Sequence, residues 1–141
     1  MRGLRWGALA LALVVSGAQA ASLGLEYGME GPGLRITAEP FGVATGWRLR
    51  VSAPDFAHGV FLVDYLGSVP LGHSGEQHVF FGAGGDLWLG TDGGYLVGGH
   101  VSGGLEFGAA DTLSVSLEGD LHYLTDGSLR PAFGAALNFR L

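Results

Sequence analysis

The C-terminal part of the chain reads LSVSLEGDLHY over Leu113–Tyr123 and LRPAFGAALNFRL over Leu129–Leu141. Apolar and polar residues alternate one by one in both stretches, and the thirteen positions of the apolar set carry no charge. Successive side chains of a β-strand point to opposite faces of the sheet, so this alternation predicts two long strands with one apolar and one polar face. The intervening Thr125–Ser128 segment (TDGS) has the composition of a tight turn, which makes the pair a hairpin.

The same alternation continues toward the N-terminus in six further candidate strands, which are separated by segments rich in Gly, Pro or Asp. Their expected ranges are Ser22–Met29, Leu34–Glu39, Gly46–Ala53, Val60–Val69, Gln77–Gly90 and Tyr95–Phe107. Short connections between consecutive strands are typical of an up-and-down meander, so the sequence predicts an all-β fold of eight antiparallel strands. Residues 60–90 are apolar or glycine-rich on both faces. The sequence therefore does not decide which of their side chains point inward.

The first 20 residues have the three parts of a secretory signal peptide. Arginines stand near the start, an apolar run follows at Trp6–Val15, and Ala18–Ala20 (AQA) has the form of a cleavage motif. We therefore expect export and cleavage of residues 1–20, which leaves one domain at residues 21–141. The alternative is an uncleaved membrane anchor.

The composition excludes several classes of protein. The chain has no cysteine, so it has neither a disulfide framework nor a thiolate nucleophile or metal ligand. It is acidic, with 13 Asp and Glu against seven Arg and no Lys, and it has no basic run, which argues against nucleic acid as a partner. Charged residues make up only 14% of the chain, whereas soluble domains usually have about 25%. No apolar run beyond the signal region approaches the length of a transmembrane helix.

Alternation alone does not say which face of a barrel meets water. The polar face combines arginines and carboxylates with many small residues, as expected for the narrow interior of a closed eight-stranded barrel. The opposite orientation would place arginines in lipid, at a cost of about 2–4 kcal/mol each near the midplane. The sequence therefore predicts a transmembrane barrel with a lumen filled by paired charges. The expected lumen network consists of Glu26, Arg35, Arg48, Arg50, Asp64, His100, Glu106, Glu118, Asp120, His122, Arg130 and Arg140.

Aromatic residues on the apolar face are expected at the two rims, as in the aromatic girdles of membrane barrels. One rim would carry Phe41, Trp47, Phe107 and Phe139, and the other would carry Tyr27, Phe61, Tyr95 and Tyr123.

The mature chain resembles the small eight-stranded outer-membrane β-barrel families of the OmpA/OmpX-like type. The resemblance is clearest from Tyr95 to Leu141, in the strand end Gly103–Phe107 (GGLEF), the short turn and the long last hairpin. It implies an outer-membrane location, contact with outer-membrane lipid and recognition by the barrel-assembly machinery. Such families commonly end on an aromatic residue, whereas this chain ends Asn138–Leu141 (NFRL). The implied function is that of an integral barrel with a structural or envelope-maintenance role.

Two other functions were weighed. A soluble periplasmic or secreted barrel would turn the apolar face inward and bind an apolar ligand. A lipid-modifying hydrolase would use His100 and Ser102, which share one face, with Glu118 on the neighbouring strand; lipid A deacylases carry a similar His-x-Ser pair. An inward pair would not reach lipid, so we expect no catalysis and a lumen histidine bonded to Ser102 and Glu118.

We expect no metal site and no cofactor. Glu118, Asp120 and His122 follow one another at every second position of one strand, and such side chains do not converge on a single point. Oligomeric state and conduction through the lumen stay open.

Overall fold

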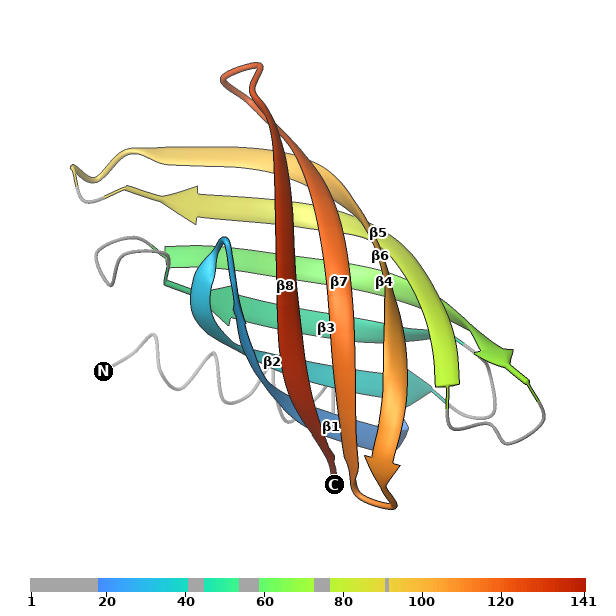
Figure 1. Cartoon of the computed structure of the whole chain (residues 1–141). Coiled ribbons are helices and arrows are strands. Elements are labelled where there is room, and N and C mark those ends of the chain that lie inside the picture. Colours follow the sequence, from blue (N-terminus) through green and yellow to red (C-terminus); the bar gives the residue numbers. More distant parts are fainter. Residues whose placement is uncertain (1–17, 41–44, 54–58, 73–76, 91) are drawn as a thin grey trace.

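The computed structural model describes residues 18–40, 45–53, 59–72, 77–90 and 92–141. These residues form eight strands: β1 (Ala18–Gly28), β2 (Gly31–Pro40), β3 (Thr45–Ser52), β4 (Gly59–Leu71), β5 (Gln77–Leu89), β6 (Tyr95–Ala110), β7 (Leu113–Leu124) and β8 (Leu129–Arg140). Each strand pairs antiparallel with its neighbours in sequence, and β8 pairs with β1 to close the barrel (Figure 1). The predicted eight-stranded antiparallel meander is confirmed. No helix among the described residues is long and apolar enough to cross a membrane.

The strand boundaries differ most from prediction where side-chain alternation is weakest. β1 begins at Ala18, inside the expected signal peptide, because the backbone of residues 18–20 pairs with the end of β2. β2, β4 and β6 also extend beyond their predicted ranges, to Pro40, Leu71 and Ala110. Strand pairing uses backbone groups, so it continues through glycine, alanine and proline-flanked segments that lack a clear pattern.

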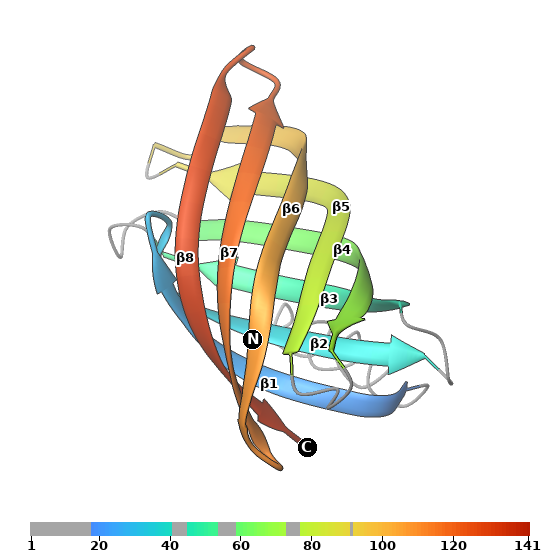
Figure 2. The ribbon, with the colours of Figure 1, turned by 45° about the vertical axis from the view of Figure 1, so that its right-hand side comes forward.

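The orientation of residues 60–90, which the sequence left open, is set by pairing with β3 and β6. In β4, Val60, Leu62 and Asp64 point inward and are fully buried, and Phe61 and Val63 point outward. In β5, Phe80, Asp86 and Trp88 belong to the inner face. The strand order around the barrel, with the seam between β8 and β1, is visible in Figure 2.

The wall of the barrel has opposite polarities on its two sides. Among the side chains described in the eight strands, those that point outward are uncharged, and large apolar ones such as Leu117, Val101 and Phe81 are about half exposed. Inward positions hold buried charged side chains, among them Arg48 and Asp64, at 2% and 0% exposure. The molecule therefore has its apolar surface outside and its ionic groups inside, the reverse of a soluble barrel.

The lumen changes in character along the barrel. Near the β5–β6 and β7–β8 turns the lumen holds apolar side chains such as Val60, Leu96 and Leu124. The middle is ionic. At the other end, where the described chain begins and ends, the lumen opens into a polar cavity of about 620 Å³ lined by residues that include Thr37, His78, Glu106, Asp111 and Arg140.

Candidate functional site

Three arginines converge on Glu118 in the middle of the lumen. Both terminal nitrogens of Arg48 donate to the Glu118 carboxylate, the Nη2–Oε1 distance being 2.9 Å. Arg50 Nη1 lies 2.5 Å from Glu118 Oε1, and Arg35 Nη1 lies 3.5 Å from Oε2. Each arginine also pairs with a second carboxylate: Glu26 for Arg35 at 2.6 Å, Asp64 for Arg48 at 2.6 Å, and Asp120 for Arg50 at 2.7 Å; Asp64 lies 3.2 Å from Arg50 as well. We call Arg35, Arg48, Arg50, Glu26, Glu118 and Asp120 the arginine cluster.

The arginine cluster bridges opposite sides of the barrel. Arg48 and Arg50 are on β3, whereas Glu118 and Asp120 are on β7, and no backbone pairing joins these two strands. The guanidinium groups therefore reach across the lumen rather than along the wall. Bidentate bonding of a planar guanidinium to a carboxylate is the geometry that arginine supplies and lysine does not, which agrees with a chain that has no lysine.

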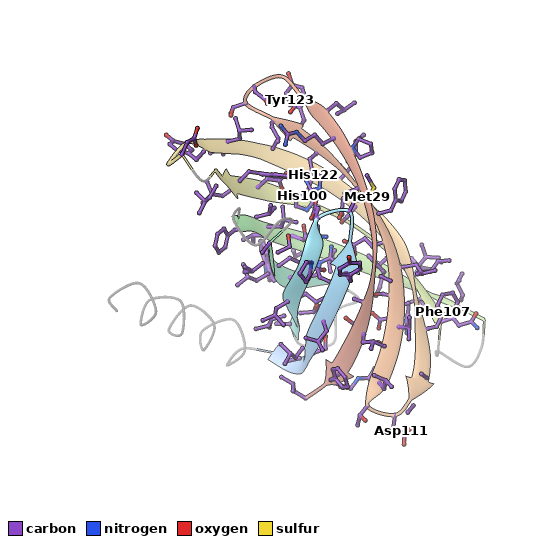
Figure 3. All side chains as sticks on the ribbon, turned by 60° about the vertical axis from the view of Figure 1, so that its left-hand side comes forward. Met29, His100, Phe107, Asp111, His122 and Tyr123 are labelled. Carbon is purple, nitrogen blue, oxygen red and sulfur yellow. The ribbon has the colours of Figure 1, made fainter. Side chains whose placement is uncertain are left out.

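A second group alternates carboxylates with imidazoles. The two ring nitrogens of His100 face different carboxylates, Nε2 facing Asp64 and Nδ1 facing Asp86. His122 Nδ1 lies 2.7 Å from the other oxygen of Asp86, and its Nε2 lies 2.5 Å from Glu30 Oε1. Figure 3 shows the two labelled histidines side by side inside the barrel. We call His100, His122, Asp86 and Glu30 the histidine cluster; Asp64 joins it to the arginine cluster.

A glycine makes the junction between the two clusters possible. In the strand register, Asp64 of β4 lies opposite Gly84 of β5, and Gly84 lies opposite His100 of β6. Because Gly84 has no side chain, the carboxylate and the imidazole meet above it, two strands apart. A Cβ at this position would also overlap the carbonyl oxygen of Val63, so only glycine fits here.

The described residues do not form the Ser–His pair that a lipid hydrolase would need. His100 directs both ring nitrogens at carboxylates, and the buried Ser102 hydroxyl has no hydrogen-bond partner. Glu118 contacts arginines, not His100. Both His100 and Ser102 are also buried inside the barrel, where a membrane lipid does not reach them.

Solved structures similar to this one are membrane barrels. A designed transmembrane β-barrel superimposes with a TM-score of 0.62 at 9% identity, over 88% of this chain and 97% of that one. The N-terminal β-barrel domain of Pseudomonas aeruginosa OprF gives 0.61 at 12% identity, over 85% and 96%. The chain has the fold of a small transmembrane β-barrel. Neisserial surface protein A gives 0.46 at 10% identity, over 86% and 92%. No family model and no curated protein matches the sequence.

The structure places nine of the twelve predicted lumen residues of this barrel in the two clusters or at their junction: Glu26, Arg35, Arg48, Arg50, Asp64, His100, Glu118, Asp120 and His122. Three lie toward its ends. Glu106 is half-buried beside the open cavity, and Arg140 is exposed there. Arg130 lies near the opposite end, 3.4 Å from Asp126 of the β7–β8 turn, with its guanidinium 5.2 Å from the Trp88 ring centre. The alternation of polar and apolar residues identified which side chains point inward, but not how far along the barrel axis each of them lies.

Two members of the histidine cluster were missed. Asp86 is on β5, whose glycine-rich sequence did not reveal its inner face. Glu30 follows β1 in the tight turn before β2, so alternation gave it no orientation. The expected bonding of His100 to Ser102 and Glu118 is wrong, because the nearer acids Asp64 and Asp86 occupy both of its nitrogens.

The predicted aromatic residues lie on the outer face of the barrel. Tyr27, Phe61, Tyr95 and Tyr123 are exposed toward one rim, and Trp47 and Phe139 are exposed on the side of the other. Figure 3 shows Phe107, which is partly exposed, at the opposite end from Tyr123. Phe41 is outside the described residues. The outer face also carries Tyr65, Phe81 and Phe133, so aromatic side chains extend beyond the two predicted groups.

Proposed function

We propose that this protein is an integral outer-membrane β-barrel with a structural or envelope-maintenance role, whose lumen is closed by its own side chains. The observation that carries the proposal is the polarity of the wall. Every outward side chain that the structure describes in the strands is uncharged, while Arg35, Arg48 and Arg50 are inside at 5% exposure or less. A surface of this kind is stable in a bilayer and would be an aggregation hazard in water.

The arginine cluster favours a closed barrel over a pore. The guanidinium groups of β3 and the carboxylates of β7 meet across the lumen, at distances down to 2.5 Å. A barrel of eight strands has an interior just wide enough to be filled by such side chains. The similarity to the OprF barrel domain supports the outer membrane as the location.

The alternative of a soluble barrel that binds an apolar ligand finds little support. Its cavity would need an apolar lining, whereas the large cavity of about 620 Å³ is lined by groups such as His78, Glu106 and Arg140. The middle of the lumen is occupied by ion pairs.

Cell fractionation tests the proposal directly. The full-length chain, expressed in a cell with two membranes, should be recovered in the outer membrane and should migrate differently in gels before and after boiling. After reconstitution in a planar bilayer it should carry no steady ionic current. Recovery from the periplasm as a soluble protein of one mobility would overturn the membrane assignment, and a steady current would overturn the closed lumen.

A charge on the outer face gives a sharper test. Leu117 is 52% exposed and points outward from the middle of β7. In a bilayer, Leu117→Arg should lower the free energy of unfolding by about 2–4 kcal/mol, because the guanidinium enters lipid. Leu117→Ala is the matched control, since it removes the apolar side chain without adding charge. Equal stability of the two variants in lipid vesicles would mean that this face meets water.

A further inference from the structure

Three ligand-type side chains meet in the histidine cluster. Asp86, His100 and His122 come from the adjacent strands β5, β6 and β7, and one potential ligand atom from each lies within 4.8 Å of the other two. All three are buried, at 4%, 4% and 0% exposure. The Nδ1 atoms of both imidazoles face the same carboxylate, one toward each oxygen. Three side chains from three strands therefore converge, as the two acids and one imidazole of a single strand (Glu118, Asp120 and His122) could not.

The surroundings carry an excess of negative charge. Within the described part of the lumen's middle there are six carboxylates, Glu26, Glu30, Asp64, Asp86, Glu118 and Asp120, against the three guanidinium groups of Arg35, Arg48 and Arg50. With neutral imidazoles three negative charges are uncompensated, and burying uncompensated charge is costly. A bound cation, protons on the imidazoles or a proton on a carboxyl group would each offset this charge, and only the first predicts that added metal binds here.

The second ring nitrogen of each histidine also faces a carboxylate. His100 Nε2 faces Asp64, and His122 Nε2 faces Glu30. A carboxylate behind a histidine is the usual outer partner of a metal-binding imidazole, since it fixes the ring and raises its basicity. His122 Nε2 is buried without a well-aligned hydrogen bond, although Glu30 Oε1 is only 2.5 Å away. Glu30 would therefore be the outer partner of His122, whose other nitrogen, Nδ1, faces Asp86.

We infer that Asp86, His100 and His122 bind one divalent transition-metal ion. Two imidazoles and one carboxylate suit zinc and its first-row neighbours and do not suit calcium or magnesium, which prefer all-oxygen sites. The ion would link β5, β6 and β7 and offset the negative charge of the lumen.

Zinc binding to the purified barrel tests the site. The refolded protein, with closure checked by heat-dependent gel mobility, is stripped with a chelator and titrated with Zn²⁺ alone. We expect one ion per chain and a higher thermal midpoint with zinc, because the ion binds only the folded state. Asp86→Asn and His122→Gln should each weaken binding at least tenfold. His78→Gln is the matched control, since His78 lines the open cavity far from the cluster, and it should bind like the wild type.

The wild-type protein supplies a readout that does not depend on the folding of variants. Zinc should shift the side-chain NMR signals of His100 and His122 and leave those of His78 in place. No retention of zinc by the wild type would overturn the proposal and leave protonation of the cluster as the means of charge balance. A shift of His78 alone, or equal affinity in Asp86→Asn and the wild type, would place the ion at the open cavity and would equally overturn it.

Discussion

The arginine cluster and the histidine cluster both place cationic groups beside buried carboxylates, but the two kinds of cation differ in how they respond to the loss of a partner. Guanidinium groups stay charged under all conditions a protein meets, so every arginine in the lumen needs its acids. An imidazole can lose its proton and become neutral, so a histidine tolerates the loss of a partner. We therefore expect the arginine cluster to need all of its ion pairs for stability (an obligatory cluster). We expect the histidine cluster to change its charge by gaining or losing a proton, or by binding a metal ion (an adjustable cluster).

Removing Glu118 should have the largest effect on this barrel. Glu118→Ala removes the acid on which Arg35, Arg48 and Arg50 converge, so the guanidinium donors that face it are left buried without a partner. Loss of one partner from a buried ion pair costs about 3–5 kcal/mol, and we expect the free energy of unfolding to fall by that amount. Urea titration in lipid vesicles measures it. Glu106→Ala, a half-buried acid beside the open cavity, is the control and should change stability by much less.

Asp86 tests the contrast between the clusters. Asp86→Ala removes the acid shared by His100 and His122, both of which can then become neutral. In metal-free protein we expect a loss of about 1–3 kcal/mol, the cost of leaving buried polar groups unsatisfied. The same urea titration compares the two variants. If Asp86→Ala is as harmful as Glu118→Ala, the distinction between obligatory and adjustable clusters is wrong.

Gly84 probes the joint between the two clusters. A Cβ at position 84 would overlap the Val63 carbonyl oxygen and enter the space where Asp64 and His100 meet. We expect Gly84→Ala to cost about 1–3 kcal/mol, as overpacking of a tight interior usually does. Gly85→Ala is a closely matched control, because the nearest atom to its Cβ is 4.0 Å away. Equal unfolding free energies for the two variants would show that the close approach at Gly84 is not needed.

The two clusters also differ in how far the sequence revealed them. The arginine cluster was predictable because β3 and β7 alternate cleanly, so that Arg48, Arg50 and Glu118 share an inner face with no competing interpretation. The inward orientation of Asp86 was not predictable, because the strand segment Phe80–Leu89 (FFGAGGDLWL) is apolar or glycine-rich on both faces. Only pairing with β4 and β6 fixes which way Asp86 points, and pairing depends on residues distant in sequence.

The sequence also did not reveal how far along the barrel axis each inward side chain lies. Arg130 alternates with outward residues as the cluster arginines do, and its strand position opposite His122 gives no sign that it belongs to the rim. Its guanidinium instead pairs with Asp126 in the turn and covers the Trp88 ring. A long side chain near the end of a strand can extend its charged group toward the solvent at the rim. Alternation of polar and apolar residues does not predict this extension.

The β7–β8 turn, outside both clusters, gives the smallest expected effect and the clearest pH dependence. The Ser128 hydroxyl and backbone N–H donate to Asp126 Oδ1 at 2.5 Å and 2.9 Å, and these bonds hold the pKa of the Asp126 carboxyl below its usual range. A depressed pKa in the folded state means that the contribution to stability is present above the unfolded-state pKa and is lost as the pH falls through the folded-state value. The carboxyl group is exposed, so solvent screens it and the effect should be slight.

Asp126→Asn separates ionisation from hydrogen bonding, because the amide keeps an acceptor oxygen without the charge. At neutral pH the wild type should have a slightly higher thermal midpoint than the variant, and the gap should close as the pH falls through the lowered pKa of the folded-state carboxyl, where the wild-type group becomes protonated. Thermal midpoints of both proteins measured from neutral pH to a pH below that pKa test this. A gap that persists at the acid end would assign the difference to turn geometry, since a charge that is no longer present cannot sustain it.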